Sequence, residues 1–437
     1  MTQTDQLAHS LRTRHIVMIA LGGVMGAGYF VGSSAALSLG GPAVLISYSV
    51  TGTFVFLVNM MMRDLARKVP GRASFLQQIR YALGDRIGFV AGWAYWLTWV
   101  TVIAIEVIAV ATMLTPFIPL PYAALELIVL AAMTGLNLLS VRGYGEFEYW
   151  FAAIKVFAIA GFIALGCWAL GTQDVPVHDN LFAHGGLVPH GWLALLAVIP
   201  TILFSMGGSE ISTVAAVESD NTEQNIVRAT RTIAFRILGL YLTSVTLILC
   251  LVPWSDVTSG QSPFLLVLHR LHVPFADLFM TIVILTAALS SLNSGIYVTS
   301  RILHELARDG DAPRLFLPVD PDSHLPRRAI LGSVLSSVGV AVMAVLSPSV
   351  IFALLVSLTG AFMVFNNMLL IVGRLKLVPE RPLTSYAALL LSACILVAMI
   401  MQPETRSQIE VGSVAIIVIL LVASVRQRLR KAQNNRP

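Results

Sequence analysis

Long apolar stretches separated by short polar clusters alternate along the whole chain. Two of the stretches, 16–62 and 329–373, each continue for more than forty residues without an acidic, basic or histidine side chain. A helix of about 20 apolar residues crosses about 30 Å of hydrocarbon, so each stretch is long enough for two spans. Gly40-Gly41-Pro42 and Ser347-Pro348 are the expected hinges between those spans. This pattern predicts a protein that crosses a membrane as a series of helices.

Extended to the whole chain, the pattern predicts an all-α integral membrane protein with about twelve transmembrane helices. The polar connections are short, so residues 1–437 are expected to form a single transmembrane unit without a soluble domain. The expected spans lie at 16–39, 42–62, 87–113, 122–141, 147–170, 191–214, 233–254, 275–301, 329–346, 349–373, 383–402 and 409–425.

Composition and charge support this interpretation. Hydrophobic residues make up 57% of the chain and charged residues 12%, which excludes a soluble globular protein. Of the 28 Lys and Arg residues, all but Arg270 and Arg406 fall on one side of the expected helices, so topology explains the net charge of +5 better than nucleic acid does. Both termini are therefore expected in the cytoplasm, with the chain in a cell membrane such as the bacterial inner membrane. The basic segment 426–431 is placed to touch anionic membrane lipid.

Several function classes find no support in the sequence motifs. No lysine follows a glycine, so the phosphate-binding loop of an ATP-driven pump is absent. The sequence has no Gly-x-Ser-x-Gly or His-Glu-x-x-His motif of an enzyme and no repeated pore segment of a channel. Cys167, Cys250 and Cys394 stand alone in separate apolar stretches, so no disulfide, metal or other cofactor is expected. An amino-acid-gated channel or a membrane enzyme stays as the alternative to a transporter.

The first and sixth expected spans are interrupted in the same manner. Span 1 contains a cluster of glycines between Gly22 and Gly32, and span 6 contains Pro200 followed by Gly207-Gly208. One interpretation is close helix packing, because small residues four positions apart let helices approach each other. The other interpretation is a local break in each helix, where backbone groups are released from the helical hydrogen-bond pattern.

The position of the two interruptions favours broken helices. Spans 1 and 6 begin two five-helix halves, at 14–170 and 190–373, which enter the membrane from opposite sides. Two further helices follow at 383–427. Matching interruptions in inverted halves are typical of transporters whose binding site lies near the middle of the membrane.

Broken helices offer backbone groups to both ends of a zwitterion. At Gly26, Ala27 and Gly28 the freed N–H groups suit a carboxylate, and glycine lets that group approach the backbone. At Phe204, Ser205 and Met206 the freed carbonyls suit an ammonium group. Tyr29 and Glu210 flank these segments and complete the expected binding site.

Three ionisable residues lie well inside the expected spans, where an unpaired charge costs several kcal/mol. Lys155 either extends to the cytoplasmic surface or couples transport to protons, with Ser290 and Ser291 of span 8 as partners. Glu106 either makes a hydrogen bond inside the bundle or lies on the substrate pathway. Glu210 either caps the freed N–H groups of span 6 or belongs to the site.

These motifs resemble the amino acid transporter family of the amino acid/polyamine/organocation (APC) superfamily, and are closest to those of bacterial γ-aminobutyrate (GABA) permeases. The resemblance covers nearly the whole chain, because several motifs occur in order at the expected helices. In addition to the glycine cluster, the motifs are Thr13-Arg14-His15, Asn137-Leu-Leu-Ser-Val141, Tyr144-Gly-Glu-Phe-Glu148, Phe204-Ser-Met-Gly-Gly-Ser-Glu210, Ala215-Ala-Val-Glu218-Ser-Asp, Asn293-Ser-Gly-Ile-Tyr297-Val-Thr-Ser-Arg301 and Ala307-Arg-Asp-Gly-Asp-Ala-Pro313.

The resemblance implies an inverted five-plus-five fold with two extra helices. It also implies uptake of an amino acid with a proton by alternating access, with Lys155 at the position of a sodium site in other relatives. The expected substrate is γ-aminobutyrate or a related neutral amino acid. The alternative is another neutral α-amino acid, namely an aromatic one, proline, serine or alanine, since Gly28 and Met206 depart from the family's usual residues at the site.

Overall fold

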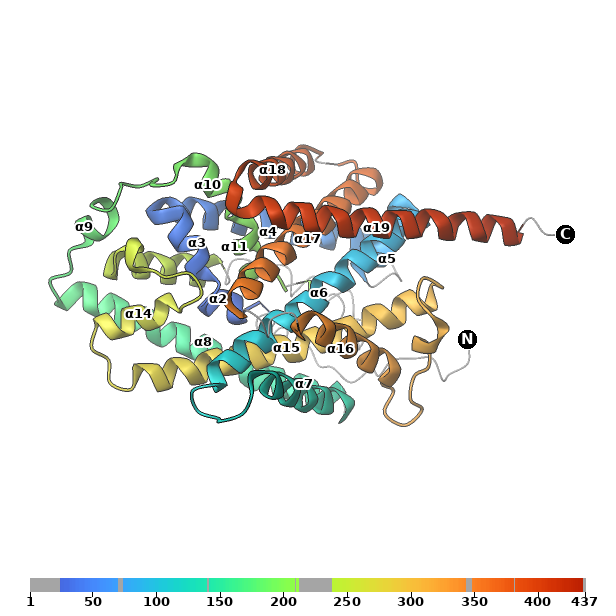
Figure 1. Ribbon diagram of the computed structural model, residues 1–437. Helices are drawn as coiled ribbons and strands as arrows, with labels where there is room; N and C mark the ends of the chain where they lie inside the picture. The colour runs from blue at the N-terminus through green and yellow to red at the C-terminus, as the bar shows by residue number, and fades with distance from the viewer. Residues whose placement is uncertain are drawn as a thin grey trace.

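The computed structural model describes residues 24–69, 74–139, 141–208, 210–211, 238–342, 348–380 and 382–434. Within these ranges the chain forms helices and no strand, so the expectation of an all-α protein is confirmed. Figure 1 shows the helices as one bundle, with the C-terminal helix running along one side and projecting past the rest.

The longer helices form the bundle. They are α4 (Val44–Lys68), α6 (Asp85–Leu114), α7 (Tyr122–Leu139), α8 (Val141–Thr172), α15 (Ala276–Arg308), α16 (Arg327–Ala341), α17 (Pro348–Leu377), α18 (Pro382–Met401) and α19 (Pro403–Asn434). The shorter elements are α2 (Ala27–Phe30), α3 (Ser33–Gly40), η2 (Gly41–Ala43), α5 (Phe75–Leu83), α9 (Val177–Phe182), α10 (Gly191–Ala197), α11 (Ile199–Met206), η3 (Trp254–Asp256), α14 (Pro263–Arg270) and η4 (Arg314–Phe316).

Eight helical segments in the described ranges are long and apolar enough to cross a membrane. One of them, Ala27–Lys68, contains the second expected span and the first from residue 27 onward, and Gly191–Met206 and Leu238–Leu251 are shorter apolar helices. Parts of expected spans 1, 4, 6, 7 and 9 lie outside the described residues. The count of twelve therefore stays a prediction.

Helices α6 and α15 form the centre of the bundle (Figure 1). Helix α6 is apolar all round and buried along most of its length, as a helix surrounded by other helices should be. Helix α15 packs along α6, while α17 packs against α6 and α8 packs against α15. Large apolar side chains on the outer helices, such as Phe157 and Leu390, are exposed and face the position that lipid occupies.

The expected hinge at Gly40-Gly41-Pro42 is confirmed. Helix α3 ends at Gly40, and Gly41 takes a positive φ of 57°, which favours glycine. The short η2 then leads into α4. The second expected hinge lies mostly outside the described residues, and α17 begins at Pro348.

The fifth span differs from its expected bounds of 147–170. Helix α8 begins at Val141 and continues to Thr172. The expected span begins just after the charge at Glu146, but the helix already begins six residues earlier than that span. Glu148 is fully buried, because partners on α15 compensate its charge.

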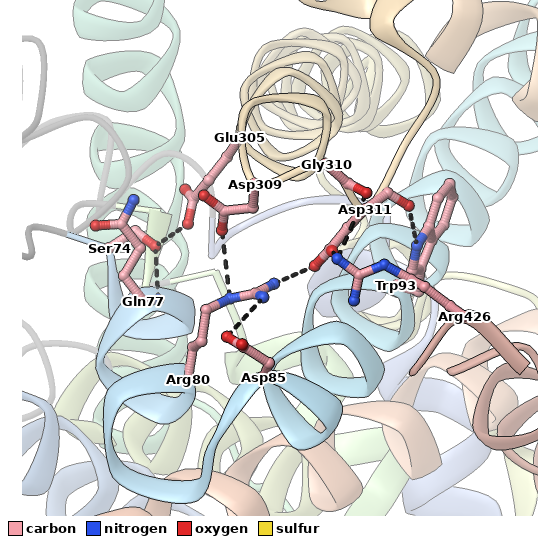
Figure 2. A network of polar contacts seen from close by, with 10 residues as sticks. All are labelled: Ser74, Gln77, Arg80, Asp85, Trp93, Glu305, Asp309, Gly310, Asp311 and Arg426. Atoms are coloured by element: carbon pink, nitrogen blue, oxygen red, sulfur yellow. Dashed lines mark hydrogen bonds and ion pairs between the residues drawn. The ribbon is translucent and has the colours of Figure 1, made fainter. Parts of the chain in front are cut away.

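An ionic cluster joins four elements at the end of the bundle that the sequence assigns to the cytoplasm (Figure 2). Arg80 of α5 lies 3.3 Å from Asp309 and 3.5 Å from Asp85, and it also pairs with Asp311. Arg426 of α19 pairs with the same Asp311 carboxylate. The cluster ties α5 and α19 to the start of α6 and to the chain just after α15.

Candidate functional site

The break in the first span is present at the expected glycines. Gly26 has an extended backbone (φ −94°, ψ −161°), and α2 begins at Ala27. The released N–H of Ala27 donates a hydrogen bond of 3.1 Å to Oε2 of Glu106 on α6. A carboxylate from within the protein therefore occupies an N–H group that the sequence analysis assigned to a substrate carboxylate.

The glycines of this break are required by close approach. A Cβ atom on Gly26 would lie 2.3 Å from Oε1 of Glu106 and 2.8 Å from Oγ of Ser291. A Cβ atom on Gly28 would lie 2.4 Å from Cε1 of Phe204. All three distances are far below ordinary van der Waals contact, so any side chain at these positions forces its neighbours to move.

The sixth span is broken as well. Helix α11 ends at Met206, Gly207 is extended and Gly208 has a φ of +107°, a backbone region that favours glycine. The N–H of Gly208 donates to Oε2 of Glu210 at 3.0 Å, which agrees with the capping interpretation of that residue. Tyr241 donates its hydroxyl hydrogen to the carbonyl of Ser205.

The two breaks meet at one small cavity. Its volume is about 10 Å³, enough for about one water molecule. The lining residues come from α2, α6, α11, α15 and α17 and from the breaks themselves: Val24, Gly26, Gly28, Trp99, Val102, Glu106, Phe204, Gly207, Ser291 and Met363. Among these residues, Glu106 is the one that carries a formal charge.

A second cavity adjoins the first on the side of the ionic cluster. It has a volume of about 30 Å³ and shares Gly207 and Met363 with the first cavity. Polar side chains line it, including Asn59, Tyr95 and Glu210. Glu210 therefore lies beyond the helix 6 break, beside this second cavity and not in the first.

Lys155 belongs to a buried polar network between α8 and α15. Its Nζ donates to Oγ of Ser290 at 2.8 Å, and Ser290 donates to Oε2 of Glu148 at 2.7 Å. The other carboxylate oxygen of Glu148 accepts from Nδ2 of Asn293 at 3.0 Å. The lysine side chain is fully buried, so the alternative in which it extends to the membrane surface does not hold.

The profile of the amino acid permease family matches residues 15–422. The chain belongs to this family. It is 33% identical over 447 residues to the aromatic amino acid transport protein AroP of Escherichia coli strain K12, across 98% of this chain and 97% of that protein. It is 35% identical over 377 residues to the gamma-aminobutyric acid permease of Bacillus subtilis strain 168, across 85% and 80% of the two chains.

These findings confirm an amino acid permease of the APC superfamily and a multi-pass membrane protein. They also agree with a transporter rather than an enzyme, because the relatives are transporters. The two relatives are named after different substrates, the first after aromatic amino acids and the second after γ-aminobutyrate. The family therefore establishes the class of substrate and leaves its identity open.

Several expected site residues of this permease do not line the first cavity. Tyr29 is fully buried in an aromatic cluster, with its hydroxyl 2.6 Å from that of Ser244 and its ring 4.1 Å from the ring of Tyr241. Ser205 donates its hydroxyl hydrogen to the carbonyl of Ile202. Met206 is buried outside the cavity lining.

The two serines of α15 point to different partners. Ser290 joins Lys155 and Glu148, whereas Ser291 lines the first cavity and bonds to the Glu106 carboxylate. Adjacent residues on a helix point about 100° apart. Helix α15 therefore contacts the first cavity and the lysine network at the same level of the bundle.

Sequence reasoning missed Glu148, Trp99 and Met363. Glu148 was quoted only as part of a family motif, because the expected span began one residue before it. A signal was available in the polar run Ser290 to Ser294, which offered a buried carboxylate several donors on one helix. Trp99 belongs to an aromatic stretch of span 3 with Trp93, Tyr95 and Trp96, which is more typical of helix packing than of a substrate platform. Met363 resembles an ordinary core residue.

Proposed function

We propose that this permease is a secondary active symporter that takes up a neutral amino acid with a proton by alternating access. The observation that carries the proposal is the meeting of the helix 1 and helix 6 breaks at one small cavity. Backbone dipoles of opposite sign at the two breaks match a carboxylate and an ammonium group. Glu106 leaves the Ala27 N–H when the substrate carboxylate arrives.

The substrate is γ-aminobutyrate or a related neutral amino acid. A cationic amino acid would need an acidic side chain in the cavity lining that has no other partner, and Glu106, the acidic residue there, keeps its bond to Ser291 in this proposal. A specific observation favours an aromatic amino acid as the second candidate. Trp99, Phe204 and Met363 give the cavity an apolar and aromatic lining that suits a large apolar side chain.

Lys155 couples transport to protons in this proposal. Its ammonium group bonds to Ser290 of α15, and a bonded lysine holds α8 against α15 as a bound cation would. Loss of the proton weakens that attachment and shifts the balance between the two orientations of the bundle. The chain acts in the bacterial inner membrane with both termini in the cytoplasm, and the halves 14–170 and 190–373 move against each other.

Counterflow into proteoliposomes with a panel of labelled amino acids tests the substrate. Competition by γ-aminobutyrate or by aromatic amino acids supports the first or the second candidate, and competition by cationic amino acids alone contradicts both. An imposed inward proton gradient without Na⁺ tests the coupling. Wild-type protein should concentrate substrate, whereas Lys155→Gln should exchange it without concentrating it. A Na⁺ requirement in the wild type would refute the proton as the coupling ion.

A further inference from the structure

The network around Lys155 contains a second ionisable group with no assigned role. Glu148 lies on the same helix, seven residues before Lys155, which places both on one face. It is fully buried, and both carboxylate oxygens accept hydrogen bonds from α15. Asn137 of α7 donates to Asn293 at 2.7 Å and so fixes the orientation of that amide toward Glu148.

A single hydroxyl connects the two ionisable groups. Ser290 accepts from Lys155 at 2.8 Å and donates to Glu148 at 2.7 Å, so its hydroxyl lies on a continuous line of hydrogen bonds. A hydroxyl can receive a proton on its oxygen and release its own hydrogen to the next acceptor. Among the described residues, the charged groups that act electrostatically on Lys155 are Glu148 and Glu106, and the one that acts on Glu148 is Lys155.

We propose that Glu148, Ser290 and Lys155 form a proton relay, in which Glu148 receives the proton that Lys155 releases on the cytoplasmic side of the cycle. This inference rests on the proposed proton coupling. The lysine ammonium gives a proton to Ser290 Oγ as the Ser290 hydrogen passes to Glu148. The products are a neutral amine and a neutral carboxylic acid, so atoms and charge balance. Rotation of the serine hydroxyl then resets the relay.

The direction of the relay follows from the order of residues along α8. This helix is expected to enter the membrane from the cytoplasm, so Glu148 is nearer to that side than Lys155. Tyr144 lies one helical turn before Glu148, on the side expected to face the cytoplasm. Its hydroxyl shares a hydrogen bond of 3.2 Å with that of Ser294, and its ring stacks on the ring of Tyr297 with the ring centres 4.3 Å apart. The guanidinium of Arg301 lies 4.0 Å from the centre of the Tyr297 ring. Polar groups thus continue from Glu148 toward the cytoplasmic end of the bundle.

A role in packing alone makes a different prediction. Removing one partner of a buried ion pair destabilises the fold, whatever the protons do. Ser290→Ala leaves both charges in place and interrupts the line between them, while Ser290→Thr keeps a hydroxyl. The relay therefore requires that Ala and Thr at this position differ in coupling, whereas simple packing does not.

The test compares two kinds of transport in proteoliposomes, with labelled γ-aminobutyrate and L-phenylalanine as probes. Glu148→Gln and Ser290→Ala should retain counterflow. Under an inward proton gradient, however, their uptake of labelled amino acid should be no greater than their uptake without a gradient. Ser290→Thr should recover gradient-driven uptake. Matched controls are Glu126→Gln, a buried carboxylate on α7, and Ser337→Ala, a buried serine on α16. Both controls should respond to the gradient as the wild type does.

The possible results separate the relay from the function on which it rests. Gradient-driven uptake that survives in both Glu148→Gln and Ser290→Ala would overturn the relay. Loss of counterflow together with gradient-driven uptake in Ser290→Ala would also overturn it, since the serine would then be structural. If Glu148→Gln does not fold, Ser290→Ala decides alone. A wild type that exchanges both probes without responding to a proton gradient would refute the proposed coupling itself.

Discussion

At the scale of single residues, Gly28 places a tight steric constraint on the cavity. An added Cβ would lie 2.4 Å from Cε1 and 2.7 Å from Cδ1 of the Phe204 ring. Overpacking of this kind costs about 1–3 kcal/mol. Because the ring also lines the cavity, Gly28→Ala is expected to push it into the substrate position and to weaken apparent affinity in counterflow roughly 5- to 150-fold.

Gly161→Ala on α8 is the matched control for this substitution. Its Cβ would have no heavy atom within 4 Å, so its apparent affinity should equal that of the wild type. Thermal unfolding of both variants in detergent separates a local effect from loss of the fold. An unchanged affinity in a folded Gly28→Ala protein would show that the Phe204 ring does not border the bound substrate.

The sequence predicted those residues that a cluster of glycines or a buried charge makes conspicuous in an apolar span. Gly26, Gly28 and Lys155 each stand out against an apolar background, and the structure places the two glycines at the cavity and Lys155 in the buried network. Trp99 and Met363 could not be found in this way. Which face of α6 or α17 borders the cavity depends on how those helices pack against distant parts of the chain, and local sequence does not record that packing.

At the scale of elements, helix interruptions were easier to predict than helix ends. The breaks follow from glycine and proline, whose backbone effects are local. The start of α8 was misplaced because charged residues usually mark a loop. Here the carboxylate of Glu148 is compensated by Ser290 and Asn293, more than 140 residues later in the chain. Tertiary partners thus override the local signal.

The ionic cluster shown in Figure 2 gives a prediction at this scale. Arg80 pairs with three carboxylates on two segments, the start of α6 and the chain just after α15, and the side chain of Asp311 is fully buried. Losing hydrogen bonds to charged groups costs about 1.5–3 kcal/mol each. In Arg80→Gln the buried Asp311 loses one of its two described ion-pair partners and keeps only Arg426. This variant is therefore expected to lower the midpoint of thermal unfolding by several degrees.

Arg406→Gln provides the comparison for the Arg80 variant. Arg406 pairs with Glu410 at 3.1 Å on the surface of α19, and both side chains are about two thirds exposed. Exposed pairs contribute about 0–1 kcal/mol. This variant should unfold within about a degree of the wild type. Equal midpoints for the two variants would mean that the cluster does not hold α5 to the rest of the bundle.

At the scale of the whole molecule, helix α15 links the proposed binding of substrate to the proposed coupling to protons. Helix α15 contributes Ser291 to the cavity and Ser290 to the lysine network, while α6 carries Glu106 between them. A shift of α15 relative to α8 would change both places together. The proposed alternating movement of the two halves therefore needs no separate pathway between substrate and proton.

The orientation of the whole chain is the last prediction, and it follows from the uneven distribution of Lys and Arg. His184, near α9, and Asp322, between α15 and α16, are both exposed and are expected on opposite sides of the membrane. In a protein whose three cysteines have been replaced by Ala, a membrane-impermeant maleimide should label His184→Cys in intact cells. It should label Asp322→Cys only after the cells are permeabilised. The reverse pattern would place both termini outside, and would also reverse the direction of the proposed relay.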